Sequence, residues 1–157
     1  MSEEEEVRRA VDLGYRALAA RDRTEAELRA FLERKRAEPA AIDAAVEELR
    51  AAGYVDDARY ATRFAEDKRT LARWGGERIE RELLRRGVPA EHVAAAIAGH
   101  EPEEERRAAL ALLGERFRAG LEDDRERDRA WRLLVRRGYG PELAYEAVRA
   151  HARASAT

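Results

Sequence analysis

The sequence contains no cysteine, few glycines and prolines, and no long apolar run. Without cysteine the chain has no disulfide framework, no thiolate metal site and no cysteine nucleophile. Apolar runs stay far short of the roughly 18 residues that a membrane span needs. The N-terminus, Met1–Glu6, is acidic, unlike the basic start of a secretory signal. These absences lead us to expect a cytoplasmic protein that does not bind membranes.

The chain is highly charged but nearly balanced. Charged residues make up 41% of the sequence, and the formal net charge is −2. A chain with this balance is not expected to bind nucleic acid through bulk charge. All cations except Lys35 and Lys68 are arginine. Arginine suits planar recognition of carboxylate and phosphate, but the arginine and alanine codons of a GC-rich genome explain the bias equally well.

What the sequence does contain is a near repeat with a period of 51 residues. Four apolar positions in the first copy are followed by apolar residues at +51 and again at +102. The twelve residues are Leu28, Leu32, Ile42 and Val46, then Ile79, Leu83, Val93 and Ile97, then Ala130, Leu134, Ala144 and Val148. A fixed period of this kind is typical of a tandem or stacked architecture.

Each copy is predicted to hold three helices, because apolar residues recur at three and four positions and strand-like alternation is absent. Thr24 and Glu27 fit a capping box at the start of a helix. Glycines such as Gly53, Gly87 and Gly138 fit helix ends. We predict an all-α tandem array: an acidic N-terminal segment at 1–9, three-helix repeats at 10–55, 56–101 and 102–151, and a C-terminal tail at 152–157.

Arginines on the second helix of repeats two and three also follow the period. At about 100° per residue, Arg78, Arg81 and Arg85 lie on the side of the helix opposite Ile79 and Leu83. A solvated helix face, or attraction of cations to a helix C-terminus, would explain any one of them. The recurrence of the arginines in two repeats favours a partner-binding surface as strongly as a solvated one. The predicted partner-binding residues are Arg78, Arg81, Arg85, Arg86, Arg125, Arg129, Arg132, Arg136 and Arg137.

Motifs for catalysis, cofactors or metals are not found. Gly75-Gly76 lies in a helical connection and lacks the pattern of a phosphate-binding loop. His100 and His151 are related by the repeat, which suggests a position near a helix end rather than a metal site. Asp56-Asp57 is explained as a helix cap. We therefore expect no enzyme activity, no catalytic residue, no cofactor and no metal.

Three segments resemble the RecX family. The segment 53–61, GYVDDARYA, is similar to the family pattern G-[YLF]-[LVI]-[ND]-D-x-x-[FY]-A. The segment 76–88, GERIERELLRRGV, resembles the family's G-x-x-[RK]-I-x-x-E-L-x-x-[RK]-G-[IV], with one residue fewer after the glycine. Arg136-Arg137-Gly138-Tyr139 is similar to a related RRGF motif in the third repeat. Together the resemblance covers about residues 10–150.

This resemblance implies a monomeric regulator of the RecA recombinase. Such a protein would bind the RecA–single-stranded DNA filament and inhibit strand exchange, ATP hydrolysis and co-protease activity, thereby modulating DNA repair and the SOS response. The family fold is an elongated, curved array of three-helix repeats. The nine arginines would then contact the filament protein, single-stranded DNA, or both.

The sequence departs from the family in two respects, and alternatives stay open. The first-repeat residue 51 positions before Gly87 is Arg36 rather than glycine, and the family is often basic whereas this chain is slightly acidic. A helix-turn-helix DNA-binding module is the main alternative, since three-helix units can act in that way. A plain helical scaffold for an unknown partner is another.

Overall fold

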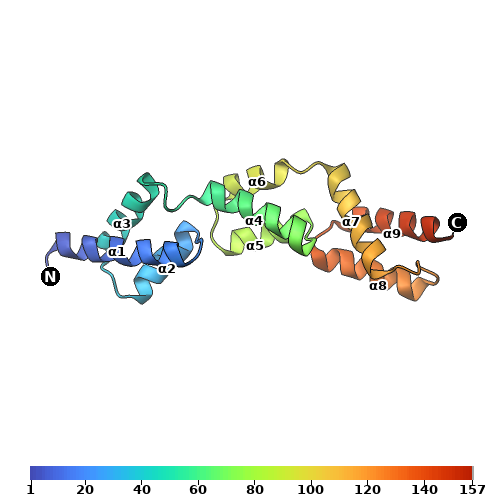
Figure 1. Cartoon of the computed structure of the whole chain (residues 1–157), viewed down its shortest axis with the longest axis horizontal. Coiled ribbons are helices and arrows are strands. Elements are labelled where there is room, and N and C mark those ends of the chain that lie inside the picture. Colours follow the sequence, from blue (N-terminus) through green and yellow to red (C-terminus); the bar gives the residue numbers. More distant parts are fainter. Residues whose placement is uncertain (157) are drawn as a thin grey trace. The chain divides into compact units, whose positions relative to one another are not determined.

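The computed structural model describes residues 1–156, which form nine α-helices and no strand (Figure 1). The all-α repeat fold expected from the sequence is therefore confirmed. The helices are α1 (Glu3–Ala20), α2 (Glu25–Arg34), α3 (Pro39–Ala51), α4 (Asp57–Ala72), α5 (Gly76–Arg85), α6 (Ala90–Ala98), α7 (Pro102–Arg116), α8 (Asp124–Arg137) and α9 (Pro141–Ala156). The repeat boundaries and the curved shape stay predictions.

Both outer helices are longer than the apolar pattern suggested. Helix α1 begins at Glu3, and the Ser2 hydroxyl accepts a hydrogen bond from the Glu5 amide at 3.2 Å. Four glutamates in its first turn suit the positive end of the helix dipole, so the acidic segment is helical. Helix α9 continues to Ala156. Apolar periodicity missed the start of α1 because a cap and charge set it.

Helix starts and stops agree with the local chemistry read from the sequence. Thr24 and Glu27 form both bonds of the capping box, at 3.0 Å each. The Asp56 carboxylate caps α4 by accepting from the Arg59 amide at 3.0 Å. Gly87 and Gly138 have φ values of +86° and +99°, the left-handed conformation that ends a helix.

The described chain divides into two compact units, each with its own core. The N-terminal unit comprises Met1–Thr62 and Leu83–Val93, and the C-terminal unit comprises Arg63–Glu82 and the chain from Ala94 onward. Of the twelve periodic apolar residues, eleven are buried and Ile97 is half-buried. The 51-residue period is therefore a property of the core positions in both units.

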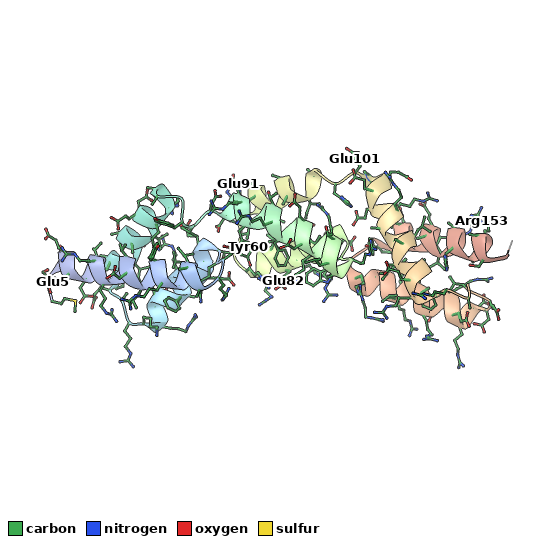
Figure 2. All side chains as sticks on the ribbon, viewed as in Figure 1. Glu5, Tyr60, Glu82, Glu91, Glu101 and Arg153 are labelled. Atoms are coloured by element: carbon green, nitrogen blue, oxygen red, sulfur yellow. The ribbon has the colours of Figure 1, made fainter. Side chains whose placement is uncertain are left out.

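Within the N-terminal unit, the start of α2 lies against the end of α5. The Thr24 hydroxyl donates to the carbonyl oxygen of Arg86 at 2.7 Å, and the Glu25 amide donates to Asp57 at 2.9 Å. A Cβ atom placed on Gly87 would lie 2.4 Å from the Cβ of Ala26. Tyr60, labelled on α4 in Figure 2, accepts a hydrogen bond from the Arg86 guanidinium at 2.5 Å. We call this arrangement the first joint.

Within the C-terminal unit, the start of α5 lies against the end of α8 in the equivalent way. The Gly75 amide donates to the carbonyl oxygen of Arg137 at 2.7 Å, and the Glu77 amide donates to that of Gly138 at 3.0 Å. Glu105 accepts from the Gly76 amide at 2.5 Å, as Asp57 does for Glu25. In this second joint, as in the first, a helix C-terminus meets a helix N-terminus, so orphan carbonyl and amide groups satisfy each other.

Candidate partner-binding surface

Three of the predicted arginines on α8 line one depression of about 340 Å³ in the C-terminal unit. Arg129, Arg132 and Arg136 lie on this helix one turn apart, and Arg116 reaches the depression from the end of α7. Arg132 forms an ion pair with Asp128 at 3.1 Å. No carboxylate is among the lining residues, which include Phe117 and Leu133. The depression is therefore strongly cationic, with a small apolar floor.

A second depression, of about 420 Å³, lies beside Trp74 in the same unit. Its walls come from the end of α4, the start of α5 and the ends of α7 and α8. Arg78, Arg116 and Arg137 line it together with Leu71. Arg116 lines both depressions, so the two adjoin each other. Seven arginines line the two depressions, and one of them, Arg73, is paired with Glu115. We call the other six the arginine surface: Arg78, Arg116, Arg129, Arg132, Arg136 and Arg137.

The arginines beside Trp74 are held in place by backbone carbonyls. Arg78 donates to the carbonyl of Arg136 at 3.3 Å, and its guanidinium lies 4.1 Å from the centre of the Trp74 ring. Arg137 donates to the carbonyl of Ala72 at 2.8 Å. Partial burial lowers the pKa of Arg137, and the positive charges of Arg116 and Arg78 lower it further. Mutual repulsion of this kind favours the binding of an anion.

The structure brings five of the nine predicted arginines to this surface. Arg81 and Arg125 are exposed but line neither depression. Arg85 and Arg86 belong to the N-terminal unit, where Arg86 takes part in the first joint. Arg86 lies just beyond the end of α5, and its backbone carbonyl accepts from Thr24 at the start of α2.

Sequence reasoning missed Arg116, Arg73 and Trp74. Arg116 sits in the last turn of α7, where a cation has the ordinary explanation of the helix dipole. Arg73 forms an ion pair with Glu115 at 2.7 Å and has a φ of +56°, which is unusual for a residue with a side chain. One signal in the sequence could have pointed to this surface: Trp74 is an aromatic residue directly before the Gly75-Gly76 pair.

A third and larger depression, of about 650 Å³, lies between α8 and α9. Trp131 and Tyr145 give it an apolar wall. Its charged residues are of both signs: Asp124, Arg127, Asp128, Arg149 and Arg153. Mixed charge provides no selectivity for an anion, so this depression is a weaker candidate than the arginine surface despite its size.

His100 lies between α6 and α7, whereas His151 lies within α9 and not at a helix end as the sequence suggested. His100 lies 3.3 Å from Glu104, and an imidazole nitrogen of His151 lies 3.0 Å from the carbonyl oxygen of Phe117. Within residues 1–156, no group of three or more potential ligands is placed to hold a metal ion. The same part of the chain has no helix long and apolar enough to cross a membrane.

Comparisons with known proteins identify the family. Residues 10–49 match the first three-helix domain of RecX, and residues 56–97 match the second. A regulatory protein RecX from Leptothrix cholodnii is 34% identical over 132 residues, which cover 84% of this chain and 82% of that protein. This chain belongs to the RecX family. Its RecX relative in Deinococcus radiodurans is 38% identical over 86% of this chain but only 64% of that protein, so the chain spans less than two thirds of it.

Solved RecX structures share the fold. The crystal structure of RecX from Lactobacillus salivarius has a TM-score of 0.82 with 14% identity, covering 94% of this chain and 97% of that chain. A second crystal structure, of a regulatory protein RecX, has a TM-score of 0.78 with 19% identity over 92% of this chain and 72% of that chain. At these identities the likeness concerns the fold alone.

Packing and helix caps explain the RecX-like segment at residues 53–61. Gly53 has a φ of +80° at the end of α3, and Val55 and Ala61 are buried. Asp56 caps its own helix, whereas Asp57 caps α2. The paired carboxylates are thus both helix caps, as the sequence suggested, but for two different helices.

Proposed function

We propose that this RecX-family chain is a non-enzymatic regulator that binds the RecA–single-stranded DNA filament. Binding inhibits strand exchange, ATP hydrolysis and co-protease activity, and thereby modulates DNA repair and the SOS response. The chain acts as a monomer in the cytoplasm. Family membership supports the choice of partner, and the arginine surface supports the mode of contact.

The observation that carries the proposal is the excess of unpaired positive charge in the C-terminal unit. Among the described residues, no carboxylate lies within ion-pair distance of Arg116, Arg129 or Arg136. The surface is therefore suited to an anionic partner, and a filament of protein on DNA offers phosphates and carboxylates.

The test is RecA ATP hydrolysis on single-stranded DNA with increasing amounts of the full chain. We expect inhibition at stoichiometric amounts, together with co-sedimentation of the chain with assembled filaments. Raising the salt concentration should weaken both effects, since the contacts are between exposed charges. Absence of both co-sedimentation and inhibition at low salt would rule out the proposal.

A further inference from the structure

The depression beside Trp74, which we call the Trp74 groove, differs from the rest of the arginine surface. It combines three cations of that surface with Trp74 and the exposed side chain of Leu71. Leu71 in the last turn of α4 is 80% exposed, and Trp74 is half-buried. Leu71 and Trp74 therefore give the groove an apolar part next to its arginines.

The cations in the groove are free to bind an anion. The one carboxylate in its lining, Glu115, is paired with Arg73 at 2.7 Å. Among the described residues, Arg78, Arg116 and Arg137 have no carboxylate partner. Arg78 and Arg137 each give one N–H to a backbone carbonyl, which leaves the other donors of each planar guanidinium available. Such preorganised guanidinium groups match phosphate oxygens well.

The aromatic part of the groove adds a second kind of contact. The Trp74 ring has the Arg78 guanidinium at 4.1 Å and the Lys68 ammonium at 4.7 Å from its centre. A guanidinium stacked on an indole extends a planar surface against which a nucleobase can pack. A carboxylate-rich peptide would use the arginines but would leave Leu71 and Trp74 without a counterpart. The pairing of phosphate-binding and base-packing groups favours a nucleotide chain.

We propose that the Trp74 groove binds a short segment of single-stranded nucleic acid, with phosphates on Arg78, Arg116 and Arg137 and a base beside Leu71 and Trp74. This inference specifies one ligand of the proposed function and rests on it for its biological setting, but the binding itself requires no RecA. The nearly balanced net charge of the chain agrees with a contact that engages only a few phosphates.

The experiment measures binding of a fluorescently labelled oligothymidylate to the full chain by anisotropy over a series of salt concentrations, without RecA. Three phosphate contacts on a single strand predict a slope of log affinity against log salt of about −2. Arg116→Gln should weaken binding by about fivefold to tenfold and reduce the slope by about 0.7. Arg107→Gln, an equally exposed arginine of α7 outside the groove, should change neither.

Two further variants separate base packing from charge. Trp74→Leu should lower the affinity without changing the salt slope, and circular dichroism would show whether the fold is kept. Arg78→Lys keeps the charge but loses the planar stack, so it should weaken oligothymidylate more than inorganic pyrophosphate. Equal weakening of both ligands would contradict the base contact.

The competing ligands provide the decisive outcomes. Polyglutamate that competes with oligothymidylate at equal charge would overturn the inference in favour of an acidic protein segment. Thymidine monophosphate that binds as tightly as the oligomer would overturn it in favour of a free nucleotide. If oligothymidylate does not bind while RecA ATP hydrolysis is still inhibited, the groove inference fails and the proposed function stands. If oligothymidylate binds while RecA ATP hydrolysis is not inhibited, the groove inference stands and the proposed function fails.

Discussion

The backbone amide of Gly75 donates a 2.7 Å hydrogen bond to the carbonyl oxygen of Arg137, and the pair is offset by 51 residues from Thr24 and Arg86, whose hydroxyl and carbonyl are also 2.7 Å apart. The repeat therefore extends beyond apolar positions to the polar contacts that fasten one helix end to another. The donor is the side chain of Thr24 in one contact and the backbone of Gly75 in the other, whereas the acceptor is a backbone carbonyl in both.

Glycine at the ends of α5 and α8 should be required for two separate reasons. Gly53→Ala serves as the reference, because Gly53 has a φ of +80° and nothing within 4 Å of the added Cβ. We expect it to lower the free energy of unfolding by about 1 kcal/mol, the cost of a left-handed alanine. Gly87→Ala should cost about 2–4 kcal/mol, because its Cβ would also meet Ala26 at 2.4 Å. Urea denaturation measures both, and equal losses would contradict the role of close packing.

Thr24 should matter more than an ordinary helix cap. It is fully buried, accepts from the Glu27 amide and donates to the Arg86 carbonyl. Thr24→Ala removes the cap and leaves a carbonyl without its partner, so we expect a loss of about 2–3 kcal/mol in unfolding free energy. Thr24→Ser keeps the hydroxyl and should recover most of this loss. A serine variant as unstable as the alanine variant would show that packing of the methyl group dominates.

Tyr139 should make the C-terminal unit sensitive to high pH. Its buried hydroxyl donates to the Arg73 carbonyl at 2.9 Å, and burial raises its pKa from 10.0 to about 12. Between these two values the unfolded chain releases the phenolic proton and the folded chain keeps it, so stability falls as pH rises. The contribution is complete below pH 10 and lost by about pH 12. Tyr139→Phe should be less stable by about 1 kcal/mol at pH 8 from the lost hydrogen bond, and should show a smaller decline above pH 10.

Asp57 should act as a cap whose charge is not required. Burial is the main cause that raises the pKa of its carboxyl group, while the hydrogen bond from the Glu25 amide opposes the shift. A raised carboxyl pKa means that stability decreases as pH rises through the interval between the unfolded and folded values. Asp57→Asn keeps an acceptor without charge and should be nearly neutral at pH 7, whereas Asp57→Ala should cost about 1 kcal/mol. Thermal unfolding of the pair tests this, and equal losses would imply that the charge matters.

Charge reversal should separate the arginine surface from the remainder of the predicted stripes. We expect Arg129→Glu combined with Arg136→Glu to reduce co-sedimentation with RecA filaments by tenfold or more at low salt. The matched control, Arg107→Glu with Arg118→Glu, changes the net charge equally on exposed arginines that line neither depression of the arginine surface. Similar losses in both variants would indicate a general charge effect rather than a site.

The helices and the core could be predicted from the sequence because they depend on local signals. The apolar period located the core, and Thr24 with Glu27 gave a true capping box. The joints could not be predicted, since Asp57 and Glu105 cap helices far from them in sequence. Of the six arginines of the arginine surface, the sequence predicted all but Arg116. Arg116 joins the α8 arginines through tertiary packing, and no spacing in the sequence relates them.

The conformation of Arg36 has a consequence for the length of such arrays. Arg36 occupies the place of Gly87 and Gly138 at the end of α2, with a left-handed φ of +61°. The carbonyl of Lys35, equivalent by the repeat to those of Arg86 and Arg137, accepts from the Arg9 guanidinium of α1 at 3.0 Å rather than from a helix start. A duplication that inserted another three-helix unit ahead of α2 would have to change this arginine to glycine before the new unit could dock.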